Sequence, residues 1–207
     1  HCVIVFFMKT HKNKKSSRHN SLLPPLSAFE STGHKIIEGN HPAILDEESL
    51  LKEVTLDFGR ASGPGGQHRN RKATACCATH VPTGISGEAT ERRRQSENRK
   101  MAISRLRRIL AVQLRRKIDV DTYKNSKLWE SRRTETQLAI NPKHHDYPNI
   151  LAEALDIIFA FDFEMNEAAN KLQISATQLL KIVAHENSAL TWLNTERTEL
   201  GLSTLKT

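Results

Sequence analysis

Residues 62–71 read SGPGGQHRNR, and their types could do chemistry on a charged partner. Three glycines and a proline fill positions 63–66, and a neutral amide, Gln67, follows beside cationic side chains. Glycine has no Cβ atom and adopts positive φ angles, so this backbone can approach another molecule closely. The neighbouring cations suit phosphate groups. The stretch therefore predicts a loop that presents one amide to a polyanion.

The charge of the chain is uneven along its length. The 207 residues carry a net charge of +8, with a sequence pI of about 9.6. Residues 60–117 contain 15 Lys and Arg against 3 Asp and Glu, a net of +12, whereas residues 151–207 contain 4 against 8, a net of −4. Such a one-sided excess is typical of a surface that binds nucleic acid. We expect the first of these segments, and not the second, to face a polyanion.

The elements that must hold the loop follow from periodicity. Residues 54–58 alternate apolar and polar side chains, and residues 75–81 and 85–90 flank the turn residues Pro82-Thr83-Gly84, which together predict three strands with a hairpin. Residues 96–117 predict one long amphipathic helix. Its apolar stripe consists of Ala102, Leu106, Ile109, Leu110 and Leu114, and its other faces carry Arg99, Lys100, Arg105, Arg107, Arg108, Arg115 and Arg116.

Composition divides the chain into four parts. Residues 1–40 predict a disordered basic arm, in which Met8 is a candidate start, residues 41–118 the loop-bearing domain, residues 119–149 a linker, and residues 150–207 an all-helical C-terminal module. The apolar run at residues 3–8 is too short to span a membrane, and the three cysteines lack a metal-binding spacing. These features predict a cytoplasmic protein of the α+β class, with no membrane partner.

Three motifs in fixed order resemble one known family. From residue 54 to residue 114, order and spacing resemble the GGQ domain of class I peptide chain release factors and of their small ribosome-rescue relatives. The resemblance is carried by Ser62-Gly63-x-Gly65-Gly66-Gln67-His68-x-Asn70, Thr79-His80-x-Pro82-Thr83-Gly84-Ile85 and Arg93-x-Gln95-x-x-Asn98-Arg99. The departures from the family pattern are Pro64, Arg69, Arg71 and Arg94.

The resemblance implies a fold and a chemistry. It implies a small mixed β-sheet with the GGQ loop at its tip, the long helix packed across one face, and hydrolysis of the ester that joins a peptide to tRNA. Gly65, Gly66 and Gln67 are the implied catalytic residues. The backbone N–H of Gln67 would stabilise the transition state and its side chain would place water. The implied RNA contacts are Arg60, Arg69, Arg71, Lys72, Arg93, Arg99, Arg105 and Arg108.

The same resemblance sets the expected partners. They are the large-subunit rRNA and peptidyl-tRNA on the ribosome, and a glutamine methyltransferase acting on Gln67. We expect a monomer without a cofactor or metal. The sequence offers no space for a codon-reading domain around the matched segment, and its C-terminus is acidic. We therefore expect codon-independent release or rescue of stalled ribosomes.

Other interpretations remain open from the residues alone. The chain could be a non-enzymatic RNA- or DNA-binding regulator, because residues 167–193 resemble a helix-turn-helix with Ser175 as an N-cap, although Lys181 is the one cation of its second helix. A phosphate-binding P-loop is disfavoured, since no Gly-Lys-Ser/Thr follows the glycines. His144, His145 and Asp146 could be metal ligands, but adjacent histidines rarely converge, which favours a helix-entry role for Asp146.

Overall fold

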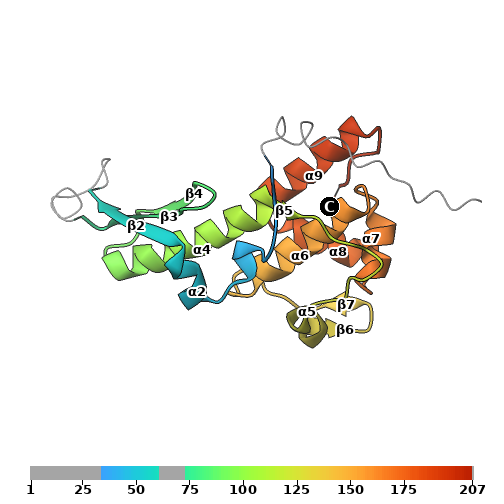
Figure 1. Cartoon of the computed structure of the whole chain (residues 1–207), viewed down its shortest axis with the longest axis horizontal. Coiled ribbons are helices and arrows are strands. Elements are labelled where there is room, and N and C mark those ends of the chain that lie inside the picture. The colour runs from blue at the N-terminus through green and yellow to red at the C-terminus, as the bar shows by residue number, and fades with distance from the viewer. Residues whose placement is uncertain (1–33, 61–72, 207) are drawn as a thin grey trace, which may run out of the picture.

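The computed structural model of the chain describes residues 34–60 and 73–206 (Figure 1). These residues form small sheets and several helices, which agrees with the α+β class. In chain order the elements are β1 (Lys35–Ile37), η1 (Pro42–Ile44), α2 (Glu47–Lys52), β2 (Val54–Gly59), β3 (Ala75–His80), β4 (Ile85–Ala89), α4 (Gln95–Gln113), β5 (Leu114–Arg116), α5 (Lys127–Arg132), β6 (Arg133–Thr134), β7 (Gln137–Leu138), α6 (Tyr147–Ala160), α7 (Met165–Lys171), α8 (Ala176–Ala184) and α9 (Asn187–Glu199).

The sheet that carries the loop has three antiparallel strands in the order β2-β3-β4. Its hairpin closes at the pair His80 and Ile85, where Gly84 takes a φ of +72° that favours glycine. The family resemblance implies a mixed sheet, but each described sheet is of one kind. The parallel pairing occurs in a separate two-stranded sheet, where β1 pairs with β5. Residues 35–37 thus form a strand, although they fall in the predicted arm.

Helix α4 lies between the sheet and the C-terminal helices (Figure 1). Its predicted stripe is buried at Ala102, Leu106 and Leu110, while Ile109 is half-buried. Ile103 and Val112, outside the stripe, are buried as well. The helix is covered on two sides, by β3 and β4 on one and by η1 and α6 on the other, so apolar residues are needed around more of its surface than one stripe.

The long helix ends earlier than its periodicity predicts. Leu114 has extended backbone angles, φ −108° and ψ 143°, and begins the short strand β5. Lys35 is its partner in β1. Leu114 is nevertheless fully buried, because the extended chain keeps its side chain in the same core as Leu110.

Helices α6 to α9 make up residues 147–199 together with short connections. Helix α6 is buried along almost its whole length and packs against α4, β5, η1, α7 and α8. An N-cap hydrogen bond of 3.2 Å from the Gln178 N–H to the Ser175 hydroxyl begins α8. The turn before it uses Gln173, whose φ is +57°.

Residues 119–149 depart from the predicted linker, because they are packed onto the helices. Trp129 on α5 has no exposed surface, and its indole N–H donates a hydrogen bond of 3.1 Å to the Leu172 carbonyl. The Ser175 N–H donates to the Thr136 carbonyl at 3.0 Å. Side chains of both α5 and the β6–β7 hairpin therefore belong to the core that α6, α7 and α8 build.

Within residues 34–60 and 73–206, no helix is both long enough and apolar enough to cross a lipid bilayer.

Candidate active site

The candidate catalytic residues sit between two described strands. Gly65, Gly66 and Gln67 lie outside the described residues, as do the predicted RNA contacts Arg69, Arg71 and Lys72. The last pair of the β2–β3 ladder joins Gly59 to Ala75. Residues 60–74 therefore leave and re-enter the sheet at neighbouring points, and the described roots of this loop are residues 58–60 and 73–75.

The exit root of the loop is tied to the first turns of α4. The Asn98 side chain is buried, and its Nδ2 donates hydrogen bonds to the Thr74 carbonyl at 2.6 Å and the Arg92 carbonyl at 3.0 Å. Its Oδ1 accepts from the Arg92 N–H at 2.9 Å. One turn earlier, the Gln95 Nε2 donates to the Ala73 carbonyl at 3.2 Å. Both residues fall in a motif of the family resemblance, which gives them no role.

The entry root presents an aromatic ring beside a cation. Phe58, near the end of the edge strand β2, is 42% exposed, and Arg60 is exposed two residues later. An exposed ring next to a guanidinium suits an unpaired base and its phosphate. Arg60, a predicted RNA contact, is thus an exposed residue at the root of the loop.

His80 fixes the far end of the hairpin. It is buried, with its Nδ1 2.8 Å from the Thr83 hydroxyl and its Nε2 2.9 Å from a Glu53 carboxylate oxygen. The Val81 N–H also donates to the Glu53 carbonyl at 2.8 Å. This part of the family-like motif therefore has a structural role, because it joins the turn to Glu53, the residue before β2.

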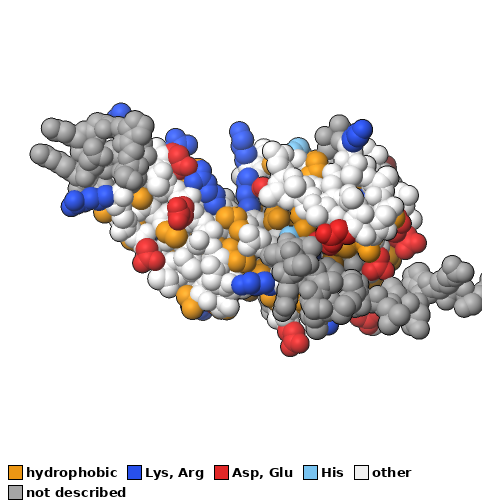
Figure 2. All heavy atoms as spheres, turned by 90° about the horizontal axis from the view of Figure 1, so that it is seen from above, with side chains coloured by type: hydrophobic (Ala, Val, Ile, Leu, Met, Phe, Trp, Pro, Cys, Tyr) orange, Lys and Arg blue, Asp and Glu red, His pale blue; other side chains and the backbone are white. Residues whose placement is uncertain are grey.

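The cations of residues 92–116 divide into two groups. The first group is exposed at the start of α4, on the same end of the molecule as the loop roots. Arg93 and Arg99 belong to it, and neither forms an ion pair with another residue that the structure describes. Figure 2 shows Lys and Arg side chains beside the undescribed residues at that end, with acidic side chains between them. The group consists of Arg92, Arg93, Arg94, Arg99 and Lys100.

Arg105 and Arg108 belong to the second group, whose guanidinium groups bind within the protein. Arg105 donates to the Glu88 carbonyl at 2.6 Å and pairs with Glu91 at 2.6 Å. Arg108 donates to the Pro142 carbonyl at 2.5 Å and lies over the Tyr147 ring, 5.5 Å from its centroid. The family resemblance implies that both bind RNA, and the structure places both in contacts that join α4 to its neighbours.

Three further arginines of this group are structural. Arg107 is largely buried and donates to the Ala43, Leu45 and His145 carbonyls and to Asn149, and burial lowers its pKa. Arg115 is fully buried, 3.7 Å from Asp156 and 4.3 Å from the centre of the Trp192 ring. Burial lowers the pKa of Arg115 to about 10, so it remains charged at neutral pH. Arg116 donates from its Nε to Asp156 at 2.7 Å.

His41 is a neutral histidine beside this arginine cluster. Its Nδ1 accepts the Ala43 N–H at 3.1 Å, which leaves Nε2 to donate to the Leu114 carbonyl at 3.3 Å. Burial, followed by the charge of Arg115, lowers the pKa of His41 to about 3. The imidazole is therefore held in one tautomer, with its proton on Nε2, and its two hydrogen bonds join η1 to β5.

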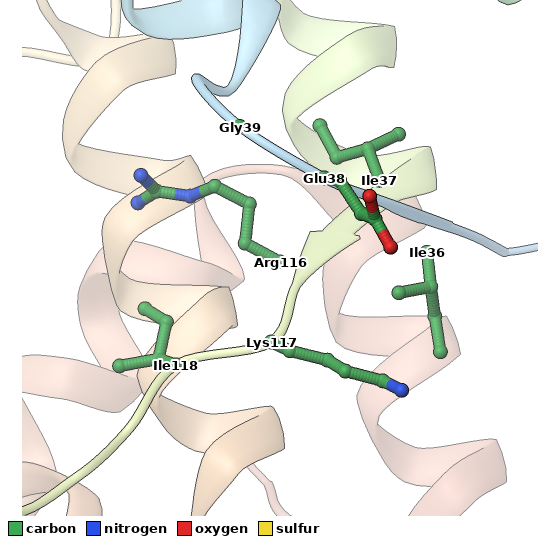
Figure 3. Close-up of a pocket in the computed structure, with 7 residues that line it drawn as sticks. All are labelled: Ile36, Ile37, Glu38, Gly39, Arg116, Lys117 and Ile118. Atoms are coloured by element: carbon green, nitrogen blue, oxygen red, sulfur yellow. The ribbon is translucent and has the colours of Figure 1, made fainter.

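A cavity of about 470 Å³ lies where β1 meets the end of β5. Figure 3 shows the Arg116 and Lys117 side chains extending to opposite sides of the chain. Glu38, the residue that follows β1, lies across from them. A neighbouring cavity of about 530 Å³ shares Arg116, Lys117 and Ile118 and includes the buried Glu153. Both cavities present both signs of charge, so neither selects a polyanion.

The segment His144-His145-Asp146 is brought together more closely than expected. One ligand atom from each residue lies within 4.8 Å of the others, so the expectation that adjacent histidines do not converge is wrong here. Asp146 is paired with Arg132 at 2.5 Å, and that positive charge opposes a cation at the same carboxylate. Asp146 also begins α6, its carbonyl accepting from the Asn149 and Ile150 N–H groups.

The helix-turn-helix interpretation gains no support from the described surface. Helices α7 and α8 are present, but Ala168, Ala169, Leu179 and Val183 are buried in the shared core. Lys181 is the one cation within α8. These helices serve as packing elements.

The part of the chain that contains the loop roots, residues 58–60 and 73–75, is similar to known proteins. Residues 48–145 match the RF-1 domain family. Peptide chain release factor 1 of Nitrosomonas europaea is 43% identical over 42% of this chain and 30% of its own length. The mitochondrial peptide chain release factor 1-like protein of Rattus norvegicus is 45% identical over 27% of this chain and 15% of its own.

The chain is also similar to a release factor with a different name. Peptide chain release factor 2 of Lactiplantibacillus plantarum is 45% identical over 30% of this chain and 17% of its own length. The chain thus spans less than a third of each of these relatives. The match covers β2, β3, β4 and α4, that is, the loop with both of its roots and the helix that holds one of them. Residues 48–145 of this chain are thus similar to the RF-1 domain of peptide chain release factors.

Proposed function

We propose that this protein hydrolyses the ester of peptidyl-tRNA on the ribosome. The observation that carries the proposal is the GGQ tripeptide at residues 65–67 inside the RF-1 match, between strand ends paired at Gly59 and Ala75. Such a loop lets a backbone N–H and an amide enter a narrow RNA-walled site. There the N–H of Gln67 would stabilise charge on the reacting oxygen, and its side chain would place water.

The described surface around the loop roots supports an RNA partner. Arg60, Arg93 and Arg99 are exposed there, and Phe58 offers a ring for stacking. The proposed partners are large-subunit rRNA and peptidyl-tRNA. We also propose that the protein acts as a monomer and that Gln67 is a substrate of a glutamine methyltransferase.

We propose further that release by these 207 residues does not depend on a stop codon. The packing and charge of the residues that follow the family match, which ends at residue 145, support this proposal. Helices α6 to α9 are packed onto the end of α4, and residues 151–207 carry 8 acidic against 4 basic residues. Three of these acids and one of the basic residues are buried, which leaves five acids against three lysines at the surface. A surface with this small acidic excess does not attract RNA, so it is poorly suited to reading a codon.

The experiment that tests the catalytic role measures liberated peptide from ribosome complexes that carry labelled peptidyl-tRNA. Gln67→Ala keeps the backbone N–H and removes the side chain that would place water, so the rate is expected to fall by about 10²-fold, the cost of a misplaced reacting group. The thermal midpoint of unfolding should not change. Gln113→Ala, at an exposed glutamine ending α4, is the matched control and should keep the wild-type rate. A wild-type rate in Gln67→Ala would overturn the assignment.

Codon dependence is tested on complexes that differ in the A-site alone. Truncated, sense-codon and stop-codon messages should give equal rates, or the truncated message the fastest. A strong preference for stop codons by the isolated protein would show that α6 to α9 do contribute to decoding.

A further inference from the structure

The side chain of Asn98 joins three separate segments of the chain. It lies on α4 with no exposed surface, and it bonds to Thr74 at the loop exit and to both backbone groups of Arg92. An asparagine amide has two N–H donors and one oxygen. Both donors and the oxygen are used here, so a single side chain determines where these three segments lie relative to one another.

The segments it joins have different proposed tasks. Thr74 is the last residue before β3 on the exit side of the loop, and it lies beyond the final ladder pair at Ala75. Arg92 begins the run of three arginines that leads into α4. The direction of the chain at residues 73–74 is consequently set by the bonds from Gln95 and Asn98, because the β2–β3 ladder ends before these residues.

We propose that Asn98 is a positioning residue for peptide release, assisted by Gln95. It holds the exit of the GGQ loop at a fixed place relative to the phosphate-binding run at Arg92. This inference rests on the proposed function, since the loop needs accurate placement only if Gln67 acts on a substrate. A misplacement of about 1 Å in a catalytic group costs about 10²-fold in rate. Arg92 and its neighbours bind RNA through charge, which tolerates such a shift.

A residue that positions the loop and a residue that binds RNA should affect kcat and KM differently when they are replaced. Asn98→Ala removes all three hydrogen bonds. Asn98→Asp keeps the shape and the acceptor for the Arg92 N–H but sets a carboxylate oxygen against two carbonyls. Both variants should lower kcat for release by about 10- to 100-fold, while KM for the ribosome complex changes by less than about threefold. Gln95→Ala should show a smaller fall in kcat.

A matched asparagine separates positioning from loss of stability. Asn194 on α9 also bonds to backbone through both ends of its amide, donating to the Leu205 carbonyl at 3.1 Å and accepting from the Leu205 N–H at 2.7 Å. Asn194→Ala should lower the thermal midpoint and leave kcat unchanged at temperatures where the protein is folded. Equal falls in kcat for Asn98→Ala and Asn194→Ala would overturn the inference, as would an unchanged kcat in folded Asn98→Ala.

Amide exchange at Arg92, measured by NMR on the free protein, needs no catalytic activity. Its N–H should exchange slowly in the wild type and at least about tenfold faster in Asn98→Ala. Equal Arg92 exchange rates in the wild type and in Asn98→Ala would show that Asn98 does not hold this segment, even if peptide release is observed. If the wild type releases no peptide, the proposed function is wrong and the positioning role is wrong with it. Slow Arg92 exchange would still show that the Asn98 side chain holds the segment at Arg92.

Discussion

Asp156 on α6 accepts two hydrogen bonds from Arg116, one of 2.7 Å from the side-chain Nε and one of 3.1 Å from the backbone N–H. The carboxylate has no exposed surface, and one of its oxygens lies 3.7 Å from the buried Arg115. One acid therefore serves two consecutive residues of β5. This relationship fixes β5, which follows α4, to the C-terminal helices.

Removing the charge of Asp156 should strongly destabilise the fold. Asp156→Asn leaves Arg115 buried without the carboxylate that pairs with it at 3.7 Å, and breaking such a pair costs about 3–5 kcal/mol of unfolding free energy. Urea denaturation followed by circular dichroism measures this loss. Glu130→Gln, at the exposed pair with Arg133, is the control and should leave the midpoint nearly unchanged. Equal midpoints for the two variants would contradict a structural role for Asp156.

The neutral His41 predicts that stability decreases in acid. Its pKa is about 3 in the folded protein against 6.5 for the free side chain, so below pH 6.5 the unfolded chain binds a proton that the folded protein does not. This contribution to the unfolding free energy should fall by up to about 1.4 kcal/mol per pH unit as pH drops from 6.5 toward 3.

His41→Asn isolates that contribution. Asparagine keeps an acceptor for the Ala43 N–H but does not titrate. Unfolding free energies at pH 7, 6 and 5 should decline more steeply in the wild type than in the variant. Parallel slopes would show that His41 becomes protonated in the folded protein.

Gly87 on β4 should not tolerate a methyl group. A Cβ there would lie 2.5 Å from the Leu106 backbone nitrogen and 2.7 Å from the Ala102 carbonyl oxygen, so α4 would have to move away from the sheet. Gly87→Ala is expected to destabilise by about 1–3 kcal/mol, as overpacking does. Gly59, in β2, has open space around it, and Gly59→Ala should be nearly neutral in the same thermal melt. A stable Gly87→Ala would contradict close packing at this point.

The two groups of cations should behave differently in ribosome binding. Replacing exposed Arg93 or Arg99 with Gln should weaken binding and reduce the slope of log affinity against log salt by about 0.7–0.9 for each phosphate that is no longer neutralised. Folding should be unaffected. Arg108→Gln should instead lower thermal stability, because its contacts lie within the protein. Equal slopes in Arg99→Gln and the wild type would remove Arg99 from the RNA surface.

Local patterns were sufficient to predict the strands β2, β3 and β4, the hairpin between β3 and β4, and the starts of several helices. Alternation at residues 54–58 gives β2, and turn chemistry before Gly84 gives the hairpin, because each depends on neighbouring residues alone. Ser175 is an N-cap, as expected, since a cap acts within one turn.

Contacts between distant residues could not be predicted in this way. The run of arginines in α4 suggests a uniform RNA-binding face, but the acid that pairs with Arg115 and Arg116 lies 40 residues beyond Arg116. The polar composition of residues 119–149 likewise gives no sign that Trp129 is buried, because its neighbours α6 and α7 follow later in the chain. For the same reason, the motif that contains Asn98 indicates a family resemblance but does not predict the hydrogen bond from Asn98 to Thr74, 24 residues earlier.

Helix α4 carries the loop exit on its first turns and is secured to α6 at its other end. Its 19 residues, at about 1.5 Å each, make a rod of about 28 Å. A tilt of about 10° at one end of such a rod displaces the other by about 5 Å, more than a catalytic group tolerates. A small rotation of α4 on the C-terminal helices would therefore be enlarged at the loop exit, where Asn98 binds the Thr74 carbonyl.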